Sequence, residues 1–164
     1  MSAIGQDLVV LLPRLRRFAF MLCRSSPLAD DLVQITCEKA LASADQWSPG
    51  TRLDAWLFRI MRNAWIDHVR HHRNDAMTDD VRNHEQDLLD HESGERQIIS
   101  KLTLTEVQRA IEDLPSDQRE VLLLVCVEDL AYREAAEVLG VPIGTVMSRL
   151  SRARRRIAEV TQAA

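Results

Sequence analysis

The segment from residue 132 to residue 156 restricts the possible fold more than any other part of the chain. Ala136 is followed four positions later by Gly140, and Val146 comes six positions after that glycine. A small residue lets a second helix cross closely, and a glycine at the turn permits a positive φ. The apolar residue then fixes the crossing angle. The spacing therefore predicts a helix-turn-helix.

The second helix of this motif is expected to open between Pro142 and Thr145. From Thr145 to Arg156 the chain carries five arginines and no acid, which suits a helix that lies against DNA. The residues expected to face the major groove or its phosphates are Thr145, Met147, Ser148, Arg149 and Arg152. An ordinary helical hairpin with a basic surface is the alternative. The motif and the arginine run together favour the helix that reads DNA.

The rest of the chain also predicts helices. Apolar residues make up 46% of the chain, there are only five glycines and five prolines, and no long run alternates with period two. The formal charge of −4 hides a segregation, because residues 74–97 contain eight acids and two arginines while residues 52–73 and 145–156 are basic. We expect an all-α chain of two small domains, residues 1–73 and 98–164, joined by a flexible acidic linker over residues 74–97.

Apolar periodicity places three helices in the first domain, at about 6–24, 27–43 and 53–72. Pro13 predicts a kink or a restart in the first helix, and Ser26 is expected to cap the second, with Pro27 at its first position. The expected apolar stripe of the second helix is Leu28, Leu32, Ile35, Leu41 and neighbouring Ala40. That of the third is Leu53, Trp56, Leu57, Ile60, Met61, Ala64, Trp65 and Val69.

In the second domain, a helix is expected from about residue 97 until Pro115 stops it, and Ser116 is expected to cap the next. The apolar face of the first of these is expected to hold Ile98, Leu102, Leu104, Val107, Ile111 and Leu114. The apolar run of the second is Val121, Leu122, Leu124, Val125 and Val127. Each domain thus has enough apolar periodicity to form a helical core.

Other classes of function receive little support. Cys23, Cys37 and Cys126 show no C-x-x-C spacing and are expected to be buried, reduced thiols. His68 and His72 are four residues apart but have no third ligand at a fitting spacing, so a basic helix face is favoured over a metal site. Because no catalytic set, signal segment or membrane-length apolar run is present, we expect a cytoplasmic protein that is not an enzyme and has no cofactor or small-molecule substrate.

Two separated blocks resemble the extracytoplasmic-function (ECF) sigma factors. The sequence ADDLVQ at 29–34, with AWLFRIMRN at 55–63 and DHVR at 67–70, is similar to their sigma-2 domain. The sequence LPSDQREVL at 114–122, with GVPIGTV at 140–146 and SRLSRAR at 148–154, is similar to their sigma-4 domain. The order and separation of the blocks are more specific than either block. The first block and the Trp47–Thr51 loop look most like the alphaproteobacterial general-stress group.

This resemblance implies a role for each part of the chain. Residues matching the helix that binds the clamp helices of core RNA polymerase are Asp31, Gln34 and Glu38. The loop at 47–54 and the following helix match the part that melts the −10 promoter element, with Trp47, Arg59, Arg62, Asn63, Asp67 and Arg70 as candidates. Candidates for the −35 element are Thr145, Met147, Ser148, Arg149, Arg152 and Arg155. The implied partners are the polymerase clamp helices and flap, promoter DNA and an anti-sigma factor.

Some positions depart from the family pattern. Met147 replaces a common lysine or arginine, and Ala131 replaces the usual serine cap, which is expected to weaken the next helix by about 1 kcal/mol unless another group compensates. Trp56 and Trp65 are expected in the core, which leaves Trp47 as the more exposed tryptophan. Two other functions stay open: a sigma-like decoy that sequesters an anti-sigma factor, and a simple helix-turn-helix regulator.

Overall fold

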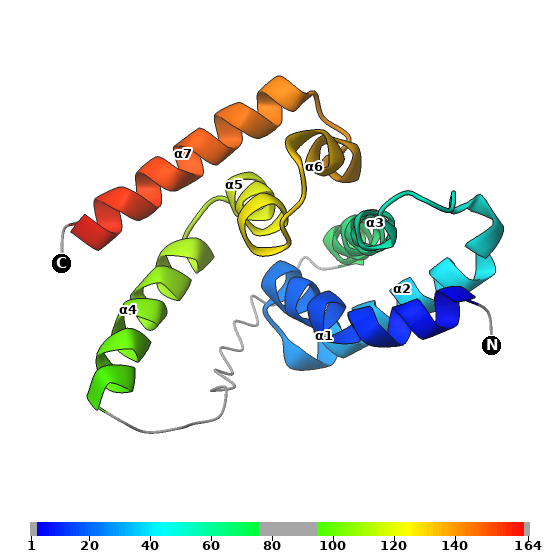
Figure 1. The fold of residues 1–164 in the computed structure, drawn as a ribbon, viewed down its shortest axis with the longest axis horizontal. Helices are drawn as coiled ribbons and strands as arrows, with labels where there is room; N and C mark the ends of the chain where they lie inside the picture. The colour runs from blue at the N-terminus through cyan, green and yellow to red at the C-terminus, as the bar shows by residue number, and fades with distance from the viewer. Residues whose placement is uncertain (1–2, 76–94, 163–164) are drawn as a thin grey trace. The chain divides into compact units, whose positions relative to one another are not determined.

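The structure is a computed structural model that describes residues 3–75 and 95–162, with side chains described for residues 3–74 and 104–161. Every regular element in these ranges is a helix (Figure 1). The elements are α1 (Ala3–Cys23), α2 (Ser26–Ala42), η1 (Ala44–Gln46), α3 (Leu53–Asp75), α4 (Glu95–Glu112), α5 (Ser116–Leu122), η2 (Leu123–Val127), α6 (Tyr132–Leu139) and α7 (Ile143–Gln162). The prediction of an all-α chain is confirmed.

The chain divides into two compact units. One contains α1, α2, η1 and α3, and the other contains α4, α5, η2, α7 and most of α6. The predicted acidic linker at 74–97 lies mostly outside the described residues. Its predicted limits overlap helices at both ends, because α3 continues to Asp75 and α4 begins at Glu95. The exact domain limits stay a prediction.

Helix α1 continues through Pro13 as one element, so the predicted restart is wrong, and a kink at Pro13 stays a prediction. The proline side chain is exposed, and the apolar residues on the other face hold the helix to the core. Buried residues of α1 are Ile4, Leu8, Leu15, Phe18, Ala19 and Leu22. Burial along the whole length of α1 offsets the one backbone hydrogen bond that a proline removes.

Helix α2 begins differently from the prediction. Its N-cap is Ser25, not Ser26, and the Ser25 hydroxyl accepts a hydrogen bond from the Leu28 N–H at 3.5 Å. Pro27 therefore occupies the second helical position. The predicted apolar stripe is also partly wrong, because Ile35 and Leu41 are 41% and 52% exposed. The residues that α2 buries are Ala29, Leu32, Thr36 and Ala40.

Thr36 helps to explain why α2 turns its smaller residues, and not Ile35 and Leu41, toward the core. Its hydroxyl donates to the Leu32 carbonyl at 2.7 Å, so the buried side chain has its hydrogen bond and presents a methyl group to the core. Small residues along this face allow α2 to pack closely against α1 and α3, which both contact it. The larger Ile35 and Leu41 are consequently left outside the core.

Helix α3 supplies the centre of the first core. Leu57, Phe58 and Met61 are fully buried, and the rings of Phe18 and Phe58 meet with centroids 4.9 Å apart. Phe58 was missing from the predicted stripe. The half-buried members of that stripe are Leu53, Trp56, Ile60, Trp65 and Val69. Trp47 is half-buried as well, so exposure does not set it apart from the other two tryptophans.

The second unit contains helices α4 and α7 packed side by side, with α5 against α7 (Figure 1). The N-cap predicted for α5 and the buried face predicted for α4 are partly wrong. The α5 N-cap is Pro115, and the expected Ser116 is the first helical residue and makes no capping bond. Helix α4 ends at Glu112, before Pro115, and Leu104 is 60% exposed. Ile98 and Leu102 lie outside the described side chains.

A π-helical turn, η2, follows α5 directly. The extra residue in a π turn rotates the side chains that follow it, so the predicted apolar run is only partly buried. Leu123 is buried although it was not predicted, whereas Val127 is 41% exposed. Cys126 is exposed, which contradicts the expected buried thiol, and Cys23 and Cys37 are only half-buried.

Burial raises the pKa of the Cys23 and Cys37 thiols above the ordinary value. Both thiols are therefore poor nucleophiles at neutral pH. Among the helices that the structure describes, none offers an apolar stretch of the length needed to cross a bilayer.

Candidate nucleic-acid and polymerase interfaces

The turn between α6 and α7 has the geometry that the motif predicted. Gly140 has a φ of +67°, and the Val141 N–H donates to the Ala136 carbonyl at 3.1 Å, which closes the end of α6. Ala135, Ala136, Val146 and Leu150 are buried. The small residues of α6 and the apolar residues of α7 therefore fix the start of α7.

We expect Gly140→Ala to lower the free energy of unfolding by about 1 kcal/mol, because an L side chain resists the left-handed region. No heavy atom lies within 4 Å of a Cβ built at this glycine, so the cost comes from the backbone and not from a clash. Thermal unfolding measures the change. Gly144→Ala, also in open space but inside helix α7, is the control and should be neutral or stabilising. Equal effects of the two substitutions would contradict the explanation.

Helix α6 is capped from within. The Glu134 carboxylate accepts a hydrogen bond from the Ala131 N–H at 2.9 Å. In a capping box, the third residue of the helix bonds back to the N-cap N–H in this way. Glu134 therefore partly compensates for the missing serine at position 131.

The exposed face of α7 is basic. Val146, Leu150 and Ala153 are buried on one side of the helix. On the other side, the exposed candidates for DNA contact are Ser148, Arg152 and Arg155. Met147 is 52% exposed but lies at the edge of this face, and Thr145 is half-buried. Ser151, which was not a predicted contact residue, is also exposed between the arginines.

Arg149 differs from the other arginines of α7. Its Nε lies 3.6 Å from Oδ2 of Asp117 on α5, and only 24% of its side chain is exposed. Asp117 was not among the predicted residues, because nothing in the sequence indicates that α5 meets α7 at this position. The contact restrains Arg149, whereas Arg152 forms no ion pair within the described residues.

The exposed face of α3 carries polar residues at helical spacing. Arg59, Asn63, Asp67 and Arg70 are exposed, opposite the buried stripe, and Arg62 is half-buried at the edge. Four predicted candidates for the −10 element thus share one surface. A mainly basic helix face of this kind can hold a nucleic-acid backbone.

Hydrogen bonds within the loop between η1 and α3, and just after it, hold this loop in place. The Thr51 hydroxyl donates to the Ser48 carbonyl at 2.6 Å, and Gly50 takes a φ of +91° between them. Just after the loop, Asp54 accepts hydrogen bonds from Arg52 at 2.6 and 3.0 Å and from Arg14 of α1 at 2.9 Å. The loop therefore has a rigid base.

Asp54 is 7% exposed, and its pKa is lowered. Burial alone would raise this pKa, but the hydrogen bonds from Arg52, Arg14 and the Ala55 N–H together outweigh burial. The carboxylate is therefore charged at neutral pH. Its two arginines join α1 to the start of α3.

A hollow of about 380 Å³ opens beside this loop. The side chains that line it are Asp7, Val10, Leu11, Trp47, Thr51, Leu53 and Asp54. The indole N–H of Trp47 is buried and has no hydrogen-bond partner within the described residues. The contribution of α1 to this hollow was not predicted, because the sequence gives no sign that the two segments meet.

Helix α2 presents the third candidate surface. Asp31, Gln34 and Glu38 are exposed, and the Gln34 amide donates to Glu38 at 3.3 Å. The exposed Ile35 lies four residues after Asp31, and the exposed Leu41 lies three residues after Glu38. Both therefore share this face of α2, which makes the surface amphipathic. The pKa of His68 on α3 is lowered, mainly by burial and also by the positive charge of the nearby His72. The negative charge of Asp31 on α2 acts in the opposite direction and raises this pKa.

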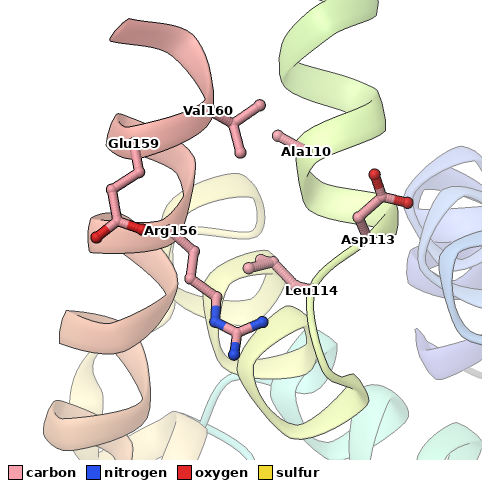
Figure 2. A pocket seen from close by; sticks show the side chains of 6 residues that line it. All are labelled: Ala110, Asp113, Leu114, Arg156, Glu159 and Val160. Atoms are coloured by element: carbon pink, nitrogen blue, oxygen red, sulfur yellow. The ribbon is translucent and has the colours of Figure 1, made fainter. Parts of the chain in front are cut away.

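The second unit has an apolar hollow of about 330 Å³ between the end of α4 and the end of α7. Figure 2 shows Ala110 and Asp113 on one side, Arg156, Glu159 and Val160 on the other, and Leu114 near the base. Val160 is 54% exposed. An apolar floor with a charged rim suits contact with another protein.

Comparison with known proteins agrees with this arrangement. Residues 9–74 match the family model of sigma-70 region 2, and residues 104–157 match that of sigma-70 region 4. The ECF RNA polymerase sigma factor EcfG of Rhodopseudomonas palustris is 36% identical over 156 residues, which cover 95% of this chain and 83% of EcfG. Both domains therefore occur in this relative in the same order.

Two solved structures share the fold. One is the sigma factor RpoE of Bartonella quintana in complex with the anti-sigma factor NepR, with 33% identity, a TM-score of 0.78, and coverage of 99% of this chain and 98% of that chain. The other is the anti-anti-sigma factor PhyR of Bartonella quintana complexed with NepR. It has 18% identity, a TM-score of 0.55, and coverage of 96% of this chain and 51% of that chain, which shows the fold alone. This chain belongs to the ECF RNA polymerase sigma factors, the alternative initiation factors that bind core RNA polymerase and direct it to promoters.

Proposed function

We propose that the three surfaces divide the work of promoter recognition. The exposed face of α7 reads the −35 element, the exposed face of α3 with the adjoining loop binds the melted −10 element, and the α2 face binds the polymerase clamp helices. The observation that supports this division most directly is the arginine-rich surface of residues 145–156 of α7, which include no acid and follow the turn of the helix-turn-helix. We assign phosphate contacts to Arg152 and Arg155, and base contacts to Thr145, Ser148 and Arg149.

For the −10 element, we assign the single-strand backbone to Arg59, Arg62 and Arg70, with Asn63 and Asp67 beside them. A base that leaves the duplex needs a pocket, and the hollow lined by Trp47 and Thr51 supports this role. The unpartnered indole N–H gives Trp47 a hydrogen-bond donor near that hollow. Trp47 then acts in the pocket and not as an exposed stacking platform.

We also propose that the α4–α7 hollow binds the polymerase flap and that an anti-sigma factor controls this protein. The relative solved with NepR supports that control. The protein then acts in the cytoplasm, within the general stress response, and catalyses no reaction of its own.

Run-off transcription with purified core RNA polymerase tests the proposed function. Adding this protein should give transcripts from a subset of promoters in a library, with none from core enzyme alone. A sigma-like decoy would give no transcript and would still bind an anti-sigma factor tightly. A simple regulator would bind duplex DNA in the absence of polymerase and would not bind core enzyme.

We expect Asp31→Ala combined with Gln34→Ala to weaken binding to core RNA polymerase about tenfold while the fold is unchanged, as for the loss of important contacts in an interface. Both side chains are exposed, so their removal leaves no cavity. Fluorescence titration measures the affinity, and circular dichroism checks the fold. Glu106→Ala on α4, which removes an exposed acid elsewhere, is the control. Unchanged affinity of the double variant would remove the α2 assignment.

A further inference from the structure

Asp117 is an acid on α5 that lies beside the predicted DNA-reading helix. Acids are unfavourable next to DNA because they repel its phosphates. Asp117 nevertheless lies with Oδ2 3.6 Å from Nε of Arg149 and is 49% exposed. Its closeness to Arg149 indicates that the role of Asp117 involves this arginine.

The Asp117 carboxylate is itself fixed. Its Oδ1 accepts the N–H of Gln118 at 2.9 Å, at the first turn of α5, where a negative charge is favourable. The other oxygen is then available to Arg149. The packing of α5 against α7 (Figure 1) maintains this geometry, since Val121 of α5 and Leu150 of α7 are both buried in the same unit.

The contact with Asp117 is made at the Nε atom of the guanidinium group, at 3.6 Å. Arginine has five N–H donors in a planar fork, and the two terminal nitrogens carry four of them. Those terminal nitrogens are the donors that a base edge would use. A bidentate contact from arginine to O6 and N7 of guanine needs that fork in a defined orientation, and an arginine already held in place loses less conformational freedom when it binds.

Building on the −35 assignment of Arg149, we propose that Asp117 is a positioning residue that orients Arg149 to read a guanine. Without Asp117, the long side chain of Arg149 can turn to a phosphate, which every DNA sequence offers. Loss of Asp117 therefore reduces discrimination between bases more than it reduces affinity for DNA.

The test uses holoenzyme and promoters that carry each of the four bases at every −35 position. Arg149→Ala should lose the preference for guanine at one position. Asp117→Asn should weaken that same preference about tenfold, within the discrimination that one bidentate contact provides, while preferences at the other positions stay unchanged. Glu106→Gln controls for the loss of one negative charge in the same unit, and circular dichroism checks the fold of each variant.

The double variant separates positioning from general structure. In the Arg149→Ala background, Asp117→Asn should have no further effect on base preference. A uniform fall in transcription over all bases in that background would overturn the proposal, as would a guanine preference that Asp117→Asn leaves intact. If Arg149→Ala itself changes no preference, the −35 assignment of Arg149 is wrong, which is a distinguishable result.

Discussion

Transcription from a cognate promoter is expected to fall about 100-fold when Arg149 and Arg152 are both replaced by alanine. An arginine contact to a base edge contributes roughly 1–3 kcal/mol of discrimination, and a phosphate contact adds affinity that depends on salt. The two side chains lie on one side of α7, so both effects should be lost together. Run-off transcription with core RNA polymerase measures the result.

Arg109→Ala is the matched control, because it removes an exposed arginine from α4 in the same unit. It should leave transcription within about twofold of the unsubstituted protein, in the range expected for a distant surface charge. Binding to core enzyme should be the same for all variants. If the double variant still gives promoter-specific transcripts at the normal level, α7 does not read the promoter.

Asp54→Asn is expected to destabilise the first unit by about 2 kcal/mol. Removing one partner of a buried ion pair costs roughly 3–5 kcal/mol, but Arg14 and Arg52 are 32% and 36% exposed, so solvent moderates the loss. Urea unfolding at neutral pH measures the change. Asp45→Asn, an exposed acid of η1 in the same unit, should have little effect.

This stabilisation also depends on pH in a defined direction. The pKa of Asp54 in the folded protein lies below its ordinary value of 3.8. The charged carboxylate therefore stabilises the fold fully above that value, and the contribution is lost as the pH falls below it. The difference between the unsubstituted protein and Asp54→Asn should be constant at neutral pH and shrink in acid. A difference that grows in acid would contradict the assignment.

The helix-turn-helix was predictable because its determinants are local. Ala136, Gly140 and Val146 act within one segment, and a positive φ at the turn leaves a direct mark on the sequence. The helical nature of the rest of the chain followed from apolar periodicity in the same way. Local signals of this kind do not depend on what the helices pack against.

The buried faces were harder to predict because they depend on neighbouring helices. Ile35 and Leu41 fit an apolar stripe, yet α2 buries smaller residues and leaves both exposed. Apolar size alone does not show that close packing is needed on the opposite side. Phe58 was missed for a related reason: it lies at the edge of the expected stripe and is buried through its contact with Phe18.

Most of the candidate site residues were correctly expected at the surface, because exposed polar residues follow from the same periodicity. The pairing of Arg149 with Asp117, and of Asp54 with Arg14, joins segments far apart in the sequence. A single sequence contains no measure of such contacts. The capping of α6 by Glu134 is a local contact. Its sequence signal is a capping box, S/T-x-x-E, in which Ala131 stands at the first position.

The length of α7 has a mechanical consequence. Twenty residues of helix extend about 30 Å, which is more than twice the roughly 12 Å width of the major groove. The first turns carry the side chains proposed to read bases, while Arg156 and Val160 line the hollow against α4 at the other end. The helix thus acts as a lever: a tilt of a few degrees imposed at Val160 would move Thr145 sideways by about 1 Å, enough to break the hydrogen bond to a base that is proposed for Thr145.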